Sequence, residues 1–188
     1  MKKIILLFFI FSLSISTYSQ NKKNTKKSVQ LIKPRNFYLN GGLRSSFGGK
    51  SRVDLKIDLP QNTVKWFYSF TTSKGKSGVK NMNLAIQLAG ILSGASATSS
   101  TLLSKITIPE GVASVDIYLV DRPNLDIFLA KGDLNGKSYS YTMEGTTQNT
   151  KSAVVEIDDV KSGTVYLGLK NPSGLSGVNI SIEVAAIV

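Results

Sequence analysis

The 188-residue sequence contains no cysteine and no histidine. Without cysteine the chain forms no disulfide, which excludes a small disulfide scaffold and any thiolate-ligated zinc or iron–sulfur site. Without histidine the Ser-His-Asp and Cys-His catalytic arrangements are excluded, and so is histidine-ligated zinc. Stability therefore has to come from an ordinary apolar core, and catalysis by a pair of carboxylates stays formally possible.

The sequence also lacks an apolar run long enough to cross a bilayer, which takes about 20 residues. Its one unbroken apolar run, Ile4 to Ile10, follows Met1-Lys2-Lys3 and precedes small residues at Thr17 and Ser19. This order is typical of a secretory signal peptide. We expect residues 1–19 to be removed and the mature protein to be secreted or periplasmic, with a retained membrane anchor as the alternative. The lysine- and asparagine-rich flank also has a bacterial character.

Acidic residues are scarce, and the formal net charge is +11. Much of the excess lies between residues 21 and 36, which hold no acid and six cations: Lys22, Lys23, Lys26, Lys27, Lys33 and Arg35. We expect residues 20–36 to be a basic disordered linker in front of a single domain at 37–188. The alternative is that these six cations contact an anionic surface such as lipid headgroups or acidic glycans. Nucleic acid is not expected as a partner, because no aromatic residues are interleaved with the lysines.

Period-2 alternation dominates the folded part. Apolar and polar residues alternate from Ser51 to Leu59 and again from Thr63 to Thr72, on either side of a short polar break, which predicts a hairpin. Trp66, Tyr68 and Phe70 share one face and are expected in the core. Phe67 points the other way, to the second surface or under a helix.

The remaining chain indicates more strands and one helix. Helical spacing covers 81–92, and a polar loop is expected at 95–101. Further strands are expected at 102–108, 113–121, 125–130, 138–143, 152–157, 164–170 and 177–188. Asp121 to Asn124 is expected to be a type I turn and Asn135-Gly136 a type I′ turn. We predict an all-β, antiparallel, jelly-roll-like β-sandwich of eight or nine strands with one short inserted helix and an apolar C-terminal strand in the centre of a sheet.

Two segments carry a resemblance to known families. Val64 to Phe70, after an alternating strand, resembles the opening of GOLD (Golgi dynamics) domains. Gly163 to Asn171, followed by a Ser/Gly turn and a last apolar strand, is similar to the end of GOLD domains and of bacterial pre-peptidase C-terminal domains. The resemblance implies a jelly-roll-like sandwich that mediates binding. Neither family lends a catalytic residue.

Candidate site residues are few. Asp121, Asn124 and Asp126 gather around one expected turn, Asp133 and Asn135 around the next, and Asp158-Asp159 around a third. Oxygen ligands in loops suit calcium, although Asp and Asn are also ordinary turn formers, so both interpretations stay open. No other cofactor is expected. The glycines at 41–42 and 48–49 lack the Lys-Ser/Thr ending of a phosphate loop and predict only a flexible turn.

These observations lead to three functional hypotheses. The first is a non-enzymatic binding module of the cell envelope or the exterior with a protein or glycan partner, contacted through residues 81–101. The second is a module anchored to an anionic membrane surface by its basic tail. The third is a carboxylate-dependent hydrolase using a pair among acids such as Glu110, Glu144, Glu156 and Glu183.

Overall fold

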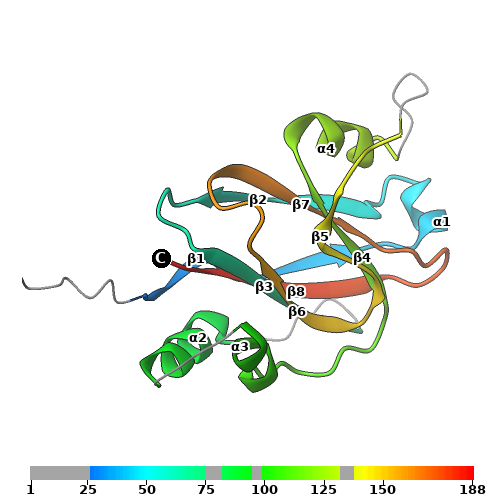
Figure 1. Ribbon diagram of the computed structural model, residues 1–188. Helices are drawn as coiled ribbons and strands as arrows, with labels where there is room; N and C mark the ends of the chain where they lie inside the picture. Colours follow the sequence, from blue (N-terminus) through cyan, green and yellow to red (C-terminus); the bar gives the residue numbers. More distant parts are fainter. Residues whose placement is uncertain (1–25, 75–81, 95–98, 132–137) are drawn as a thin grey trace, which may run out of the picture.

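Eight antiparallel strands in two four-stranded sheets form a β-sandwich, as the alternating sequence predicts. The computed structural model describes residues 26–74, 82–94, 99–131 and 138–188 (Figure 1). The first sheet contains, in spatial order, β1 (Ser28–Leu39), β8 (Val178–Ile187), β3 (Lys65–Ser73) and β6 (Ser152–Ile157). The second contains β2 (Arg52–Leu59), β7 (Gly163–Lys170), β4 (Val115–Val120) and β5 (Thr142–Thr150).

The main core lies between the two sheets. In β2 the alternation is realised directly: Leu55, Ile57 and Leu59 are buried while the charged residues between them are exposed. Figure 1 shows the two sheets as layers with this strand in the upper one. The aromatic row expected in the core is there. Trp66, Tyr68 and Phe70 all have 0% exposure and pack on one another along β3.

A second apolar layer covers the outer face of the first sheet. Helices α2 (Leu84–Ser93) and α3 (Ser99–Lys105) lie beneath it (Figure 1). Leu84 and Leu88 of α2 are fully buried in one cluster with Phe67 of β3 and Ile187 of β8. Phe67 therefore lies under the inserted helix, one of its two expected places. The two central strands of this sheet are buried on both faces, which confirms that the C-terminal strand is central.

The outer face of the second sheet is partly covered by α4 (Arg122–Leu129), which buries Leu125 and Phe128 against Tyr118 of β4 (Figure 1). The expected strand at 125–130 is therefore wrong. Asp121 accepts a hydrogen bond from the Asn124 N–H and thereby caps the helix, and a proline stands in its first turn. An Asp-x-Pro sequence serves a helix start as well as a turn, and the apolar spacing that follows fits the helix.

Two further expectations for the middle of the chain are corrected. Residues 102–108 were expected to form a strand, but residues 99–105 form α3, which buries Leu102 against the outer face of the first sheet. The inserted helix is also not alone, because the described residues contain α1 (Gly42–Ser45), α2, α3 and α4. The expected strand at 138–143 is replaced by β5, which begins at Thr142, and the expected turn at 135–136 lies outside the described residues.

The predicted hairpin of β2 and β3 is also wrong. The two strands are consecutive in the chain but belong to opposite sheets. β2 pairs with β7, and β3 pairs with β6 and β8. Alternation reports which face of a strand is buried but does not report its neighbour, and both strands satisfy the pattern by burying one face in the same core.

The disordered basic linker expected at 20–36 is wrong for residues 28–36, which belong to β1. β1 begins at Ser28 and pairs with β8, so Lys33 and Arg35 lie in a strand. The apolar residues Leu31 and Ile32 pack against the core and hold this segment in place. The signal peptide expected at 1–19, together with Lys22 and Lys23, lies outside the described residues.

Candidate functional site

One end of the sandwich is built from two loops that are joined through their backbones. The Gly42 N–H donates to the Ser173 carbonyl and the Leu43 N–H to the Gly174 carbonyl, both at 2.9 Å. A Cβ atom on Gly41 would lie 2.6 Å from the backbone of Leu175, so this close approach requires glycine. Of the glycines expected to make a flexible turn, Gly41 and Gly42 pin α1 to the β7–β8 loop, and Gly48 lies in the turn that follows α1.

Asn171 strengthens this junction from within. Its side chain is buried, and its Nδ2 donates to the Ser176 carbonyl at 2.7 Å and to the Asn40 carbonyl at 3.2 Å. Its Oδ1 accepts the Ser173 N–H at 3.0 Å. The end of β1 and the β7–β8 loop are therefore cross-linked by one amide.

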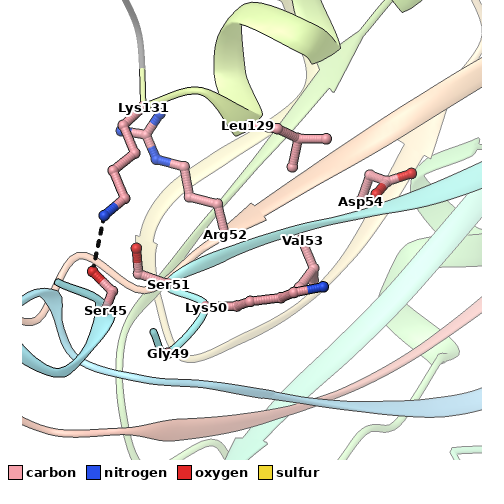
Figure 2. A pocket seen from close by; sticks show the side chains of 9 residues that line it. All are labelled: Ser45, Gly49, Lys50, Ser51, Arg52, Val53, Asp54, Leu129 and Lys131. Atoms are coloured by element: carbon pink, nitrogen blue, oxygen red, sulfur yellow. Dashed lines mark hydrogen bonds between the residues drawn. The ribbon is translucent and has the colours of Figure 1, made fainter. Parts of the chain in front are cut away.

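A pocket of about 390 Å³ lies beside this junction, between α1, the start of β2 and the end of α4 (Figure 2). The residues that line it are Ser45, Gly49, Lys50, Ser51, Arg52, Val53, Asp54, Leu129 and Lys131. Three of the nine are cations and two are serines, and they come from separate parts of the chain. The Lys131 Nζ donates to the Ser45 Oγ at 3.1 Å, which connects the end of α4 to α1.

Arg52 is held in a fixed orientation by Phe128 of α4. Its guanidinium donates to the Phe128 carbonyl at 2.6 Å and lies 5.1 Å from the centre of the Phe128 ring. Both contacts leave the positive charge without an anionic partner. A guanidinium restrained in this way loses little conformational entropy when it binds an anion.

The positive charge of the pocket is not neutralised within the described part of the chain. The ion pairs among the described residues involve other cations, and none includes Lys50, Arg52 or Lys131. The one carboxylate among the lining residues is Asp54, which lies on the side of the view away from Lys131 in Figure 2. The Ser45 hydroxyl donates to the Gly42 carbonyl at 2.7 Å, so the pocket offers ammonium and guanidinium donors and the Ser51 hydroxyl to an anionic group.

The calcium candidates are placed around the start of α4. The Asp121 Oδ1 accepts the Asn124 N–H at 3.0 Å and the Asn124 Nδ2 at 2.8 Å. Asn124 in turn accepts the Ser140 N–H at 2.7 Å, and Asp126 pairs with Arg122 at 3.1 Å. Asp121 and Asn124 are thus brought together, whereas Asp126 turns to a cation of its own helix.

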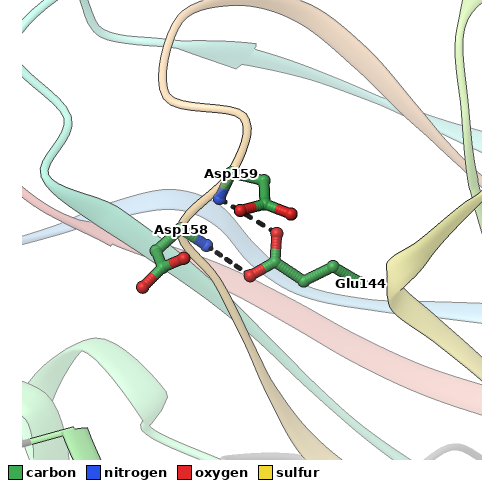
Figure 3. A group of neighbouring side chains, drawn as sticks. All are labelled: Glu144, Asp158 and Asp159. Atoms are coloured by element: carbon green, nitrogen blue, oxygen red, sulfur yellow. Dashed lines mark hydrogen bonds between the residues drawn. The ribbon is translucent and has the colours of Figure 1, made fainter.

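A different acidic group does converge. The carboxylate oxygens of Glu144, Asp158 and Asp159 lie within 4.8 Å of one another (Figure 3). Glu144 accepts the backbone N–H groups of Asp158 and Asp159, at 3.0 and 2.9 Å. The sequence indicated the aspartate pair as calcium candidates and Glu144 only among the acids considered for hydrolysis, because Glu144 lies on another strand, β5. The hydrogen bonds explain Glu144 as the anchor of the β6–β7 turn.

Two other glutamates considered for hydrolysis, Glu156 and Glu183, have partners that give them a structural role. Glu156 forms an ion pair with Lys65. Glu183 is fully buried, and its carboxylate accepts the Leu84 N–H at 3.0 Å and the Gln30 Nε2 at 2.7 Å. Both carboxylates hold neighbouring elements together.

Within residues 81–101, expected to be the contact region, the described helix α2 contributes to the packed structure. Leu84 and Leu88 are buried, and Glu183 caps the first turn of α2. Replacing this segment by a Gly/Ser turn would expose Phe67 and leave the buried Glu183 carboxylate without its Leu84 hydrogen-bond donor, so it would damage folding. Ile86, with 71% of its side chain exposed, shows the outer face of the helix.

The basic tail lies far from the pocket. Lys26 and Lys27 are exposed just before β1, and Lys33 and Arg35 are exposed on it. The pocket lies beyond the other end of β1, and Figure 1 shows α1 and the start of β1 on opposite sides of the molecule. At about 3.3 Å per residue, the two ends of β1 are roughly 35 Å apart, and Lys33 and Arg35 lie between them.

The pocket residues Lys50, Arg52 and Lys131 were not singled out from the sequence. The only local signal was the cluster of glycines around 41–49, and nothing in the sequence links it to the end of α4. Among the described residues, no helix has the length and apolar character needed to cross a membrane. No protein-family model matches the chain, and a search of curated proteins finds no significant match.

Proposed function

We propose that this protein is an exported, non-enzymatic binding module, secreted or periplasmic, that recognises an anionic group on its partner. The single observation that carries the proposal is the pocket at the α1 end of the sandwich. Three cations and the Ser51 hydroxyl, from two segments, line one space there together with a single carboxylate, Asp54, and none of these cations forms an ion pair with a described carboxylate. A phosphate, sulfate or carboxylate suits these donors.

The scaffold supports such a role. Loops on a rigid sandwich are where binding sites commonly lie. Here the loops are restrained by backbone pairing, by Asn171 and by the Lys131–Ser45 hydrogen bond, so the donors are positioned before a ligand arrives. Preorganisation of this kind lowers the entropy cost of binding.

We further propose that the sandwich is a jelly roll. The strand pairs β1–β8, β2–β7, β3–β6 and β4–β5 are all antiparallel neighbours. In these pairs the first strand pairs with the last, the second with the next to last, and so on inward. This is the pairing of one long antiparallel hairpin, with its turn between β4 and β5, that is wound into two sheets. Strands of the paired arms then alternate between the sheets, as two Greek keys require.

Titration with inorganic phosphate and sulfate, followed by amide NMR shifts, tests the anion pocket. Shifts are expected at Ser51 and Arg52, and the double variant Lys50→Gln, Lys131→Gln should weaken binding roughly tenfold or more, because it removes two charge-assisted contacts. The matched control is Lys161→Gln, an exposed lysine that does not line the pocket. Absence of shifts in the wild type, or equal affinity in the double variant, would contradict the proposal.

A second candidate function uses the basic tail as an electrostatic anchor. It is favoured by the exposure of all four described tail cations, Lys26, Lys27, Lys33 and Arg35, none of which forms an ion pair in the described chain. Charge-neutralising glutamine variants at these four positions should abolish a salt-sensitive association with envelope fractions if the tail is the anchor. Unchanged association would dismiss it.

A further inference from the structure

The end of the sandwich that carries the pocket also carries three large apolar side chains in solvent. Phe47 is 89% exposed, Leu175 is 75% exposed and Leu43 is 61% exposed. Leu43 lies in α1 and Phe47 in the turn that follows it, and the Leu43–Gly174 hydrogen bond places Leu175 next to Leu43. These three residues, called the apolar tip below, form one group on two joined loops. Exposed apolar groups of this kind mark interaction surfaces.

The charges on the two loop segments that carry the apolar tip have one sign. The two loop segments, 39–53 and 170–178, contain no acidic residue. Arg44 is exposed between Leu43 and Phe47, and the pocket with Lys50, Arg52 and Lys131 opens on the same α1 segment. Apolar side chains surrounded by cations are complementary to a surface that is apolar inside and anionic outside.

We propose that this end of the molecule docks on an anionic lipid bilayer. The apolar tip enters the boundary between headgroups and acyl chains, and the cationic pocket holds the phosphate of a lipid headgroup. The proposal rests on the proposed anion-binding function and names the source of the anion. A soluble glycan would supply the anionic group but no apolar phase for Phe47 and its neighbours.

The geometry of the tip suits shallow insertion. α1 and the β7–β8 loop lie at one end of the sandwich, so a few side chains can enter the membrane interface while the two sheets stay in water (Figure 1). Junction hydrogen bonds satisfy the backbone groups nearest the tip, including the N–H groups of Gly42 and Leu43. Satisfied backbone groups lower the cost of approaching an apolar phase. Lys26 and Lys27, just before the other end of β1, would lie away from the same bilayer.

Cosedimentation of the chain with vesicles tests the docking. Two compositions are compared, phosphatidylcholine alone and phosphatidylcholine with roughly one-third phosphatidylglycerol. The wild type should bind the anionic vesicles and much less to the neutral ones. Phe47→Ser and Leu175→Ser should each weaken binding about tenfold or more, from the apolar area that no longer leaves water. The matched control is Ile86→Ser, which removes an equally exposed apolar side chain from α2.

Insertion itself has a spectroscopic readout. Trp66 is the only tryptophan and is fully buried, so a Phe47→Trp variant reports on the tip above a constant background. Its emission should move to shorter wavelength on anionic vesicles, and lipids brominated on the acyl chain should quench it. An unshifted emission in the presence of bound vesicles would overturn insertion.

Titration with free phosphate separates this proposal from the proposed function. Phe47→Ser should bind inorganic phosphate as the wild type does, whereas the Lys50→Gln, Lys131→Gln variant should lose affinity for both phosphate and vesicles. Binding of phosphate without binding of anionic vesicles would overturn the lipid docking and leave the anion pocket standing. Vesicle binding that survives Phe47→Ser and Leu175→Ser but falls after neutralising Lys26 and Lys27 would overturn it in favour of the tail.

Discussion

Glu183 is the residue whose replacement tests the packing of the inserted segment most sharply. It lies in the middle of β8 with 0% exposure, and its two oxygens accept one hydrogen bond from Leu84 and one from Gln30. Asn83 precedes the helix in a left-handed conformation, φ 53°, and its side chain makes no capping hydrogen bond. The Glu183 carboxylate, which comes from β8, therefore takes the place of the usual N-cap residue of α2 and also faces the positive end of the helix dipole.

The Glu183→Ala variant is expected to lose about 2–4 kcal/mol of unfolding free energy. A hydrogen bond to a charged group contributes about 1.5–3 kcal/mol, and the buried Leu84 N–H would be left without an acceptor. The bond from Gln30, a more exposed partner, adds less. Removal of a buried charge offsets part of this loss, which keeps the estimate below the simple sum.

Glu183→Gln separates hydrogen bonding from charge. The amide oxygen can still accept the Leu84 N–H, and Gln30 can rotate its own amide to accept from the new NH₂ group. The loss should therefore stay below about 1 kcal/mol. Urea unfolding followed by Trp66 fluorescence gives both values, and hydrogen exchange at the Leu84 amide should accelerate in the alanine variant alone. If alanine costs less than about 0.5 kcal/mol, or glutamine costs as much as alanine, the capping argument is wrong.

Two other predictions concern the core. Gly168→Val should destabilise the protein by about 1–3 kcal/mol in a urea titration, because even a Cβ at this position would lie 2.8 Å from the Phe128 ring. The control is Gly174→Ala, where a Cβ would have no atom within 4 Å and no such loss is expected. Equal losses in the two variants would refute the packing argument. Burial raises the pKa of the Tyr68 phenol well above its ordinary value of about 10, so the folded state keeps this proton at pH values where the unfolded chain releases it. The stability that Tyr68 provides is complete below about pH 10 and decreases as the pH rises further. A Tyr68→Phe variant should show a shallower alkaline loss of stability, and an unchanged slope would show that other groups control it.

The candidate site illustrates what a sequence leaves undecided. Lys50 and Arg52 stand beside the glycine cluster, but Lys131 is far from them in sequence and comes close only because α4 packs across the second sheet through Phe128. The apolar tip arises in the same way, since Leu175 reaches Leu43 through the pairing of two loops. Residue types alone gave no reason to join these segments.

Periodicity determined the class of the fold, because a strand with one wet face needs alternating residues wherever it is placed. The β2 alternation, the Trp66-Tyr68-Phe70 row and the central C-terminal strand were all predicted correctly for that reason. Tertiary structure decided everything that depends on partners. It set β2 and β3 in opposite sheets, made a helix of Arg122–Leu129 because Leu125 and Phe128 find an apolar face to cover, and extended the first sheet to Ser28 because β8 offers an edge. Each of these choices is made by a surface that another part of the chain supplies, and a local pattern carries no record of it.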